Sequence, residues 1–157
     1  MNNLLMTFET PIIEDWIDYN GHLRDAFYFL LFSYATDALM DKIGLDEKGR
    51  AISGHTLYTL EAHINYLLEA KLDDVVQVRT QLIDRDYKRL HIVHHLYRPG
   101  TSQLLAASEQ LLMNIDQHAG RSAPFATQSE QQVNDLYNLH QGLARPEWCS
   151  RKIQIRK

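Results

Sequence analysis

Apolar positions over residues 26–43 recur every three or four residues, which predicts one long helix. Asp25 stands where an N-cap is expected, and Gly44 supplies the stop. The first two turns also carry large aromatic residues outside this apolar stripe, namely Tyr28, Phe29 and Phe32. A helix that is apolar nearly all round is usually enclosed, so we expect a sheet to wrap around this one.

Three stretches alternate between apolar and polar residues and are therefore predicted as strands. They are 58–66, 76–82 and 89–98. The segment 104–115 fits a helical period better than a strand period, but its antiparallel neighbours favour one more strand, which we predict there. Upstream of the helix, residues 6–17 are predicted to be extended with a break at Pro11, and residues 44–55 to be a polar loop.

The end of the chain predicts one smaller element. After a glycine-containing turn, Thr127 or Ser129 is the expected cap of a short helix over about 128–141, and a basic tail over about 146–157 is expected to be loose. No repeat and no low-complexity linker interrupts the sequence. We therefore expect a single domain over 1–157, of the α+β class with a helix packed on one sheet face.

Composition narrows the functional classes. The chain has 157 residues, of which 45% are hydrophobic, and its net charge of -4 argues against nucleic acid or an anionic membrane as a partner. The first residues lack the pattern of a signal peptide and no apolar run is long enough to span a bilayer, so we expect a soluble protein with no membrane partner. A single cysteine allows no intramolecular disulfide, which favours a cytoplasmic location.

The sequence contains no motif of a serine hydrolase, a phosphate-binding loop or a common zinc site. In the stretch HIVHH, a strand would point His94 away from His91 and His95, and would hold those two roughly 13 Å apart. We therefore expect ordinary polar-face histidines and no metal. Cys149 lies near the basic end with no histidine close in sequence, and we interpret it as an incidental surface thiol without a role.

The segment DYNGH places Asp18, Asn20 and His22 in a short turn just before the long helix. Amide groups at a helix N-terminus have no intrahelical partner and carry partial positive charge, so they stabilise a nearby oxyanion. A carboxylate a few residues upstream would act on the same carbonyl as base or nucleophile. Asx residues also stabilise turns by themselves, so the spacing supports a catalytic and a structural interpretation about equally.

Several motifs follow one another in a characteristic order. Asp18 stands three residues before Gly21, with His22 next, and further along come YLLEAKLDD, DYKRLHIVHHLYR and DQHAGRSAP. Together they resemble the hotdog-fold acyl-CoA thioesterases, specifically the 4-hydroxybenzoyl-CoA thioesterase-like branch. The resemblance implies a hotdog fold, in which a curved antiparallel sheet wraps a long central helix. It also implies an acyl-CoA substrate and no separate cofactor, because coenzyme A is part of the substrate.

The family resemblance assigns roles by position. Asp18 becomes the carboxylate that attacks the thioester carbonyl or activates water, and the backbone amide of Asp25 becomes the oxyanion donor. Asn20 and His22 are candidates for orienting Asp18 or the water. Candidate contacts for the anionic end of coenzyme A are Lys88, Arg89 and Arg121, with solvated turn charges as the alternative. Family members pair through their sheets, so a homodimer or homotetramer is expected.

Residues 14–41, EDWIDYNGHLRDAFYFLLFSYATDALMD, are also similar to bacterial thioesterases of carnitine degradation that act on betainyl-CoA. This similarity implies an acyl group that carries a trimethylammonium cation, for which aromatic faces are favourable partners. The candidates are Trp16, Tyr19 and Tyr28, although aromatic residues near a buried helix mostly belong to the core. Trp16 stands where most members of the branch have a second Asp.

Two other functions stay open at the level of sequence. A hotdog enoyl-CoA hydratase uses a D-x-N-P-x-H turn, which DYNGH resembles although it is one residue shorter and lacks the proline. In that enzyme Asp18 and His22 would act together on water. A non-catalytic acyl-CoA-binding hotdog protein would keep Asp18 only as a turn residue. Of the three, hydrolysis of a short-chain acyl-CoA thioester is our prediction.

Overall fold

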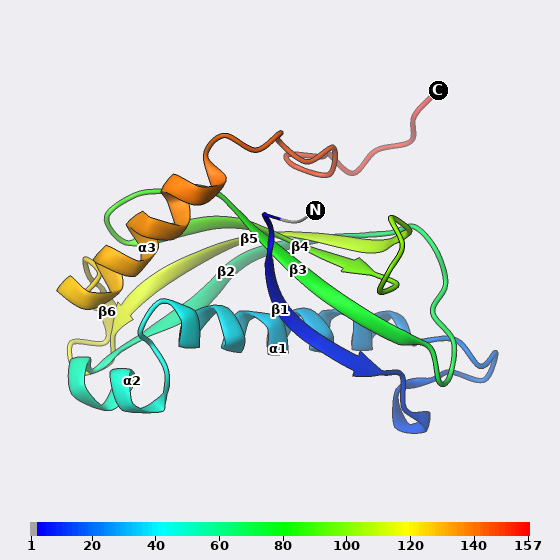
Figure 1. Cartoon of the computed structure of the whole chain (residues 1–157), viewed down its shortest axis with the longest axis horizontal. Helices are drawn as coiled ribbons and strands as arrows, with labels where there is room; N and C mark the ends of the chain where they lie inside the picture. The colour runs from blue at the N-terminus through cyan, green and yellow to red at the C-terminus, as the bar shows by residue number, and fades with distance from the viewer. Residues whose placement is uncertain (1–2) are drawn as a thin grey trace.

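A curved antiparallel sheet wraps one long helix in the computed structural model, which describes residues 3–157 (Figure 1). The strands are β1 (Leu5–Pro11), β2 (His55–Tyr66), β3 (Val75–Arg85), β4 (Arg89–Tyr97), β5 (Leu104–Asp116) and β6 (Arg121–Ser122). They follow the order β1-β3-β4-β5-β2, and β6 pairs with β5. The helices are α1 (Asp25–Lys42), α2 (Glu47–Ser53), α3 (Thr127–His140) and the short 3-10 helix η1 (Glu14–Trp16). The predicted α+β class is confirmed.

Helix α1 fills the concave side of the sheet. Leu31, Phe32 and Ala35 are fully buried. They pack in one cluster with apolar side chains of the strands, which include Val78, Leu96 and Leu105. Full burial of one large apolar side chain contributes about 1.5–3 kcal/mol. The helix is therefore held against the sheet by its apolar faces, and this packing positions its N-terminus.

The ends of α1 differ in part from the prediction. Arg24 is the N-cap and makes no side-chain cap bond, while Asp25 is the first helical residue. The Asp25 carboxylate instead accepts a hydrogen bond from the Ala26 amide at 2.9 Å. At the other end Ile43 is the C-cap, and Gly44 follows with φ of 83°. This left-handed conformation favours glycine and explains the stop.

Three local predictions need correction. The extended segment ends at Pro11, because η1 occupies part of residues 12–17. The polar loop 44–55 contains α2, whose N-cap Asp46 accepts a hydrogen bond from the Gly49 amide at 2.8 Å. The segment has no apolar periodicity, so its sequence does not predict α2 or this cap. At α3 neither Thr127 nor Ser129 is the cap, since the N-cap position falls on Ala126.

The ambiguous segment 104–115 is a strand, β5, paired with β2 on one side and β4 on the other. Its two faces are both covered along part of its length, and Ala106, Ala107 and Ser108 are all buried. A strand covered on both faces loses the alternation of apolar and polar residues that normally marks it. The neighbouring antiparallel strands therefore predicted the structure of this segment better than its own periodicity did.

His94 is a core residue, so its expected place on a polar face is wrong. It is fully buried and its ring stacks on Phe32, with the centroids 5.8 Å apart. One ring nitrogen hydrogen-bonds the Thr36 hydroxyl at 2.9 Å and the other hydrogen-bonds the Thr80 hydroxyl at 2.7 Å. Burial, with a smaller effect of nearby His95, lowers the pKa of His94 to about 3. The imidazole is therefore neutral and belongs to the packing beneath α1.

Cys149 is buried as well, which corrects its interpretation as a surface thiol. It packs against Val93 and Ala107 on the sheet face opposite α1. Burial raises the pKa of its thiol, nearby Glu109 raises it further, and Arg145 opposes both effects. The basic tail thus begins with a packed turn over the sheet (Figure 1). Within residues 3–157, no helix is both long enough and apolar enough to cross a membrane.

Candidate active site

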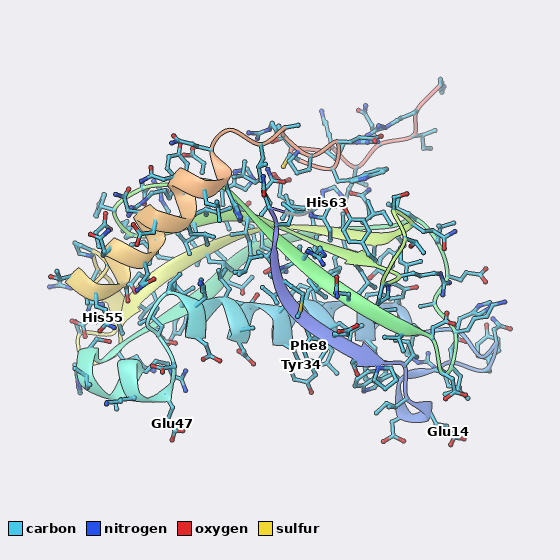
Figure 2. All side chains as sticks on the ribbon, in the orientation of Figure 1. Phe8, Glu14, Tyr34, Glu47, His55 and His63 are labelled. Atoms are coloured by element: carbon cyan, nitrogen blue, oxygen red, sulfur yellow. The ribbon has the colours of Figure 1, made fainter. Side chains whose placement is uncertain are left out.

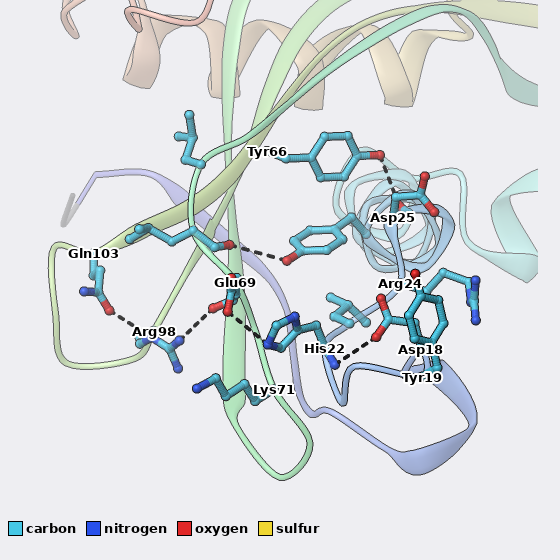
Figure 3. Close-up of a pocket in the computed structure, with 14 residues that line it drawn as sticks. Asp18, Tyr19, His22, Arg24, Asp25, Tyr66, Glu69, Lys71, Arg98 and Gln103 are labelled. Atoms are coloured by element: carbon cyan, nitrogen blue, oxygen red, sulfur yellow. Dashed lines mark hydrogen bonds and ion pairs between the residues drawn. The ribbon is translucent and has the colours of Figure 1, made fainter.

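A pocket of about 800 Å³ opens at the N-terminal end of α1 (Figure 3). Of the predicted site residues, Asp18, Tyr19, His22, Asp25 and Tyr28 line it. The segment that links β2 to β3 and the end of β4 complete the walls. From these elements come further lining residues that sequence reasoning missed, among them Tyr66, Glu69, Lys71 and Arg98. The pocket therefore joins segments that are far apart along the chain.

The turn 18–22 holds the Asp18 carboxylate by one oxygen. Asp18 Oδ1 accepts hydrogen bonds from the amides of Asn20 at 2.8 Å and His22 at 3.2 Å. The turn closes because the Asp18 amide donates to the His22 carbonyl at 2.9 Å, and Gly21 supplies a φ of 78°. Among the described residues no hydrogen bond uses Asp18 Oδ2, and Asp18 lines the pocket, so this oxygen is available for chemistry.

The charged form of Asp18 is favoured by its setting. Partial loss of solvent acts to raise the pKa of the carboxyl. The two backbone hydrogen bonds from Asn20 and His22 outweigh it, assisted by the charges of His22 and Arg24, so the pKa lies below its usual value of 3.8. Asp18 is therefore a carboxylate at neutral pH, as a nucleophile or a general base must be.

The first amides of α1 offer a donor next to this carboxylate. The Phe27 amide donates to the Arg24 carbonyl at 2.9 Å, and the Ala26 amide is taken by the Asp25 side chain. Within residues 3–157 the Asp25 amide has no acceptor. A free amide at the positive end of a helix stabilises an oxyanion in front of it. The backbone group predicted as oxyanion donor is thus unengaged, and it belongs to a residue that lines the pocket.

His22 connects a second carboxylate, that of Glu69, to the site. The ring nitrogen Nε2 of His22 lies 3.0 Å from Glu69 Oε2. A dashed line marks this pair in Figure 3. A backbone bridge between His22 and Lys71 holds the two segments together. The Arg98 guanidinium donates to the Glu69 carbonyl at 2.9 Å and so fixes the same segment. His22 is therefore a link between the Asp18 turn and the segment after β2.

Two tyrosine rings form a corner beside the start of α1. Tyr28 and Tyr66 meet edge to face, with centroids 5.1 Å apart and an interplanar angle of 85°. The Tyr66 hydroxyl donates to the Asp25 carbonyl at 3.1 Å, and the Ala70 amide donates to the Tyr28 hydroxyl at 3.3 Å. Burial raises the pKa of both phenols, so both are neutral at pH 7. Both tyrosines line the same pocket.

Comparison with known proteins agrees with this geometry. A sequence profile of the thioesterase-like superfamily matches residues 14–133. A betainyl-CoA thioesterase from Pseudomonas aeruginosa is 54% identical over 155 residues, which cover 99% of this chain and 98% of that protein. The chain belongs to the thioesterase-like superfamily. The predicted membership of the acyl-CoA thioesterase family is thereby confirmed.

Solved structures and a longer relative extend the comparison. The crystal structure of a proposed thioesterase from Pseudomonas putida is 48% identical, with a TM-score of 0.84 and 98% of each chain covered. A Staphylococcus aureus protein in complex with CoA is 32% identical, with a TM-score of 0.90, covering 98% of this chain and 97% of that one. An L-carnitine dehydrogenase/betainyl-CoA thioesterase from Rhizobium meliloti is 32% identical over 149 residues, and the match spans 30% of its length.

The remaining predicted site residues of this thioesterase-like protein lie outside the pocket or at its rim. Trp16 packs against the apolar cluster under α1. Tyr19 is 92% exposed at the rim, and Asn20 contributes its backbone amide. Lys88, Arg89 and Arg121 lie at the far end of the sheet, where Lys88 donates to Ser122 and Arg89 pairs with Asp86. Within one chain the pocket's basic side chains are instead Arg24, Lys71 and Arg98.

Proposed function

We propose that this protein hydrolyses betainyl-CoA to glycine betaine and coenzyme A. The observation that carries the proposal is that Asp18, with a free carboxylate oxygen, and Asp25, with an unengaged backbone amide, line one pocket. A thioester carbonyl needs both a nucleophile or base and a donor for the oxygen that becomes negative. The identity of 54% with the betainyl-CoA thioesterase from Pseudomonas aeruginosa supports the choice of acyl group.

The reaction follows from the placement of these groups. Asp18 Oδ2 either adds to the thioester carbonyl directly or takes a proton from a water molecule that adds to it. The Asp25 amide and the positive end of α1 stabilise the resulting oxyanion. Collapse of this intermediate expels the thiolate of coenzyme A, which takes up a proton. If Asp18 has added directly, a water molecule then hydrolyses the mixed anhydride on Asp18; if water has added, the collapse itself yields glycine betaine. His22, paired with Glu69, orients the turn that carries Asp18.

The pocket also supplies partners for a quaternary ammonium group. In betainyl-CoA this cation is one methylene away from the reacting carbonyl, so it must lie close to the start of α1. The corner of Tyr28 and Tyr66 lies there, and such aromatic faces attract quaternary ammonium groups. The carboxylates of Asp25 and Glu69 line the same pocket and add negative charge. A neutral acyl group of equal size would gain neither interaction.

Coenzyme A itself is assigned to the basic rim of the pocket. Arg98 donates to Asp74 at 2.7 Å and to the Glu69 carbonyl, which holds it at the mouth of the site. Arg24 and Lys71 are exposed on the same rim and are placed to meet phosphate groups. The similarity to a Staphylococcus aureus protein in complex with CoA supports this assignment. Lys88, Arg89 and Arg121 would take part only if a second subunit brought them to the pocket.

The geometry favours hydrolysis over the two alternatives. A hydratase would direct the side chains of Asp18 and His22 at one water molecule, whereas the His22 ring pairs with Glu69. A binding protein without activity would need Asp18 only for the turn, which Oδ1 alone holds, and would leave Oδ2 and the Asp25 amide without a role. Both alternatives therefore leave part of the observed site without a purpose.

The exposed edge of the sheet supports a homodimer or a homotetramer. Strand β2 is the last strand in the sheet order and runs for 12 residues. Tyr58 and Leu60 on this strand are 53% and 46% exposed. A long edge strand with apolar side chains pairs readily with a second chain.

We place the protein in the cytoplasm, where its single cysteine stays reduced.

The reaction class is tested by two assays on the purified protein. Betainyl-CoA should release free coenzyme A thiol, and crotonyl-CoA should not be hydrated. Hydration of crotonyl-CoA without thiol release would establish a hydratase instead. Tight binding of either compound with neither reaction would establish a non-catalytic binding protein. Size-exclusion chromatography with light scattering measures the oligomeric state on the same sample.

A further inference from the structure

Three side chains that bind metals in other proteins meet on the sheet face opposite α1. The imidazole of His91 comes from β4, the carboxylate of Glu109 from β5 and the thiol of Cys149 from the segment after α3. Their ligand atoms all lie within 4.8 Å of one another, and His91 Nε2 is 2.6 Å from Glu109 Oε2. The cluster does not line the pocket around Asp18, and no step of the proposed hydrolysis uses it.

The cluster is built by packing and hydrogen bonds. The side chains of His91 and Glu109 are only 24% and 16% exposed. The Ser150 amide donates to Glu109 Oε1 at 2.8 Å, which leaves Oε2 directed at His91. Cys149 is fixed by its contact with the sheet and by a hydrogen bond from its amide to the Pro146 carbonyl at 3.2 Å. Glu109 Oε1 thus already has the hydrogen-bond donor that normally orients a carboxylate whose other oxygen binds a metal.

We propose that His91, Glu109 and Cys149 bind a zinc ion. Thiolate, imidazole and carboxylate are the three donor types that zinc accepts, whereas a sulfur ligand disfavours magnesium and calcium. Tetrahedral zinc at about 2.0–2.3 Å from each donor would hold the donor atoms roughly 3.3–3.6 Å apart. His91 Nε2 and Glu109 Oε2 are 2.6 Å apart and all three donor atoms lie within 4.8 Å of one another, so the donors are close enough for side-chain adjustment to bring them to this spacing.

A fourth ligand position faces open space. His91 and Glu109 line a cavity of about 400 Å³, whose walls also include Glu61 and His63. His63 is the strand partner of Glu109 and therefore lies on the same face of the sheet, away from α1 (Figure 2). Water from this cavity completes four-coordination. The sequence predicts no metal because it has no common zinc motif and its clustered histidines lie on one strand, whereas the proposed ligands come from three separate segments.

The bound ion would tie the C-terminal turn to the sheet. Residues 146–150 are otherwise held to β4 and β5 by the packing of Cys149 and by the bond from Ser150 to Glu109. A zinc ion that binds only the folded chain also stabilises it. The site is therefore assigned a structural role, separate from hydrolysis.

Titration of the full-length protein, without a metal-binding tag, with cobalt(II) and then zinc(II) tests the site. Cys149 is the only cysteine in the sequence, so any thiolate-to-cobalt charge-transfer band must come from it. We expect this band and tetrahedral ligand-field bands to saturate at one equivalent of cobalt, and zinc to abolish them. Zinc should also raise the Tm of the native protein.

Variants separate this site from adventitious binding. Cys149→Ser should eliminate the charge-transfer band, and His91→Gln should weaken zinc binding by roughly 100-fold or more, because even outer-shell changes cost 10–100-fold. His118→Gln, which changes an exposed histidine outside the cluster, should bind zinc as the native protein does. No thiolate band at one equivalent, or equal zinc affinity in the native protein and His91→Gln, would overturn the proposal.

Discussion

Asp18→Asn removes the negative charge of one side chain of the pocket and keeps a side chain of the same shape. One oxygen of Asp18 accepts the amides of Asn20 at 2.8 Å and His22 at 3.2 Å, and the amide oxygen of asparagine is able to accept both. The turn should therefore survive, with a Tm change of about 2 °C or less, as for an ordinary surface substitution. The uncharged side chain, however, neither attacks a thioester nor takes a proton from water.

The expected loss of activity is large. A positioned base or acid contributes roughly 10²–10⁴-fold to a rate, which equals about 3–5 kcal/mol of activation free energy. Asp18→Asn should lower kcat for thiol release from betainyl-CoA by that factor and change KM little. Asp15→Asn, at an exposed neighbouring position outside the pocket, is the matched control and should keep native kcat. If Asp18→Asn retains more than a tenth of the native kcat, the assigned role of Asp18 is wrong.

Three further predictions address the cation corner, the buried histidines and the core. Tyr66→Leu should lower kcat/KM for betainyl-CoA by roughly 5- to 30-fold, the size of a cation–π contact, whereas Tyr66→Phe keeps the ring and should lower it less than twofold; equal losses in both variants would argue against an aromatic contact. Burial lowers the pKa of His94 to about 3 and that of His95 to about 4. The unfolded chain takes up these protons below about pH 6.5, so the free energy of unfolding should fall from there toward pH 4 by about 1.4 kcal/mol per pH unit for each histidine; equal urea midpoints at pH 7 and pH 5 would contradict this. Leu31→Ala at a fully buried position should cost about 2–5 kcal/mol in urea unfolding, and a loss below 1 kcal/mol would show that α1 is held less by its core than we infer.

Local patterns in the sequence were sufficient to predict the two backbone elements that carry the site, α1 and the turn before it. The apolar repeat of residues 26–43 identifies α1, and the turn before it places Asp18 at the helix start. Both are properties of residues that are close along the chain, so periodicity and turn chemistry reveal them. The N-cap was misplaced by one residue because Asp25 bonds to the Ala26 amide from within the helix.

The same local patterns do not predict contacts between segments that are distant along the chain. Glu69 meets His22 only because a backbone bridge aligns the segment after β2 with the turn before α1. Tyr66 ends a strand whose alternation indicates a sheet but not which helix its ring will face. Cys149 looked like a surface thiol because a short terminal turn gives no periodic signal, yet it packs on the sheet. Strand register, which one sequence does not display, decides the first two contacts, and the path of the chain after α3 decides the third.

The central claim is that this pocket hydrolyses a thioester and selects a cationic acyl group. The most direct measurement compares kcat/KM for thiol release from betainyl-CoA with that from 3,3-dimethylbutanoyl-CoA, in which a carbon replaces the quaternary nitrogen and the shape is kept. The account predicts a preference for betainyl-CoA of at least roughly fivefold, which corresponds to one cation–π contact of about 1 kcal/mol. Equal values for the two substrates, or faster release from the neutral one, would contradict the assignment of the acyl group.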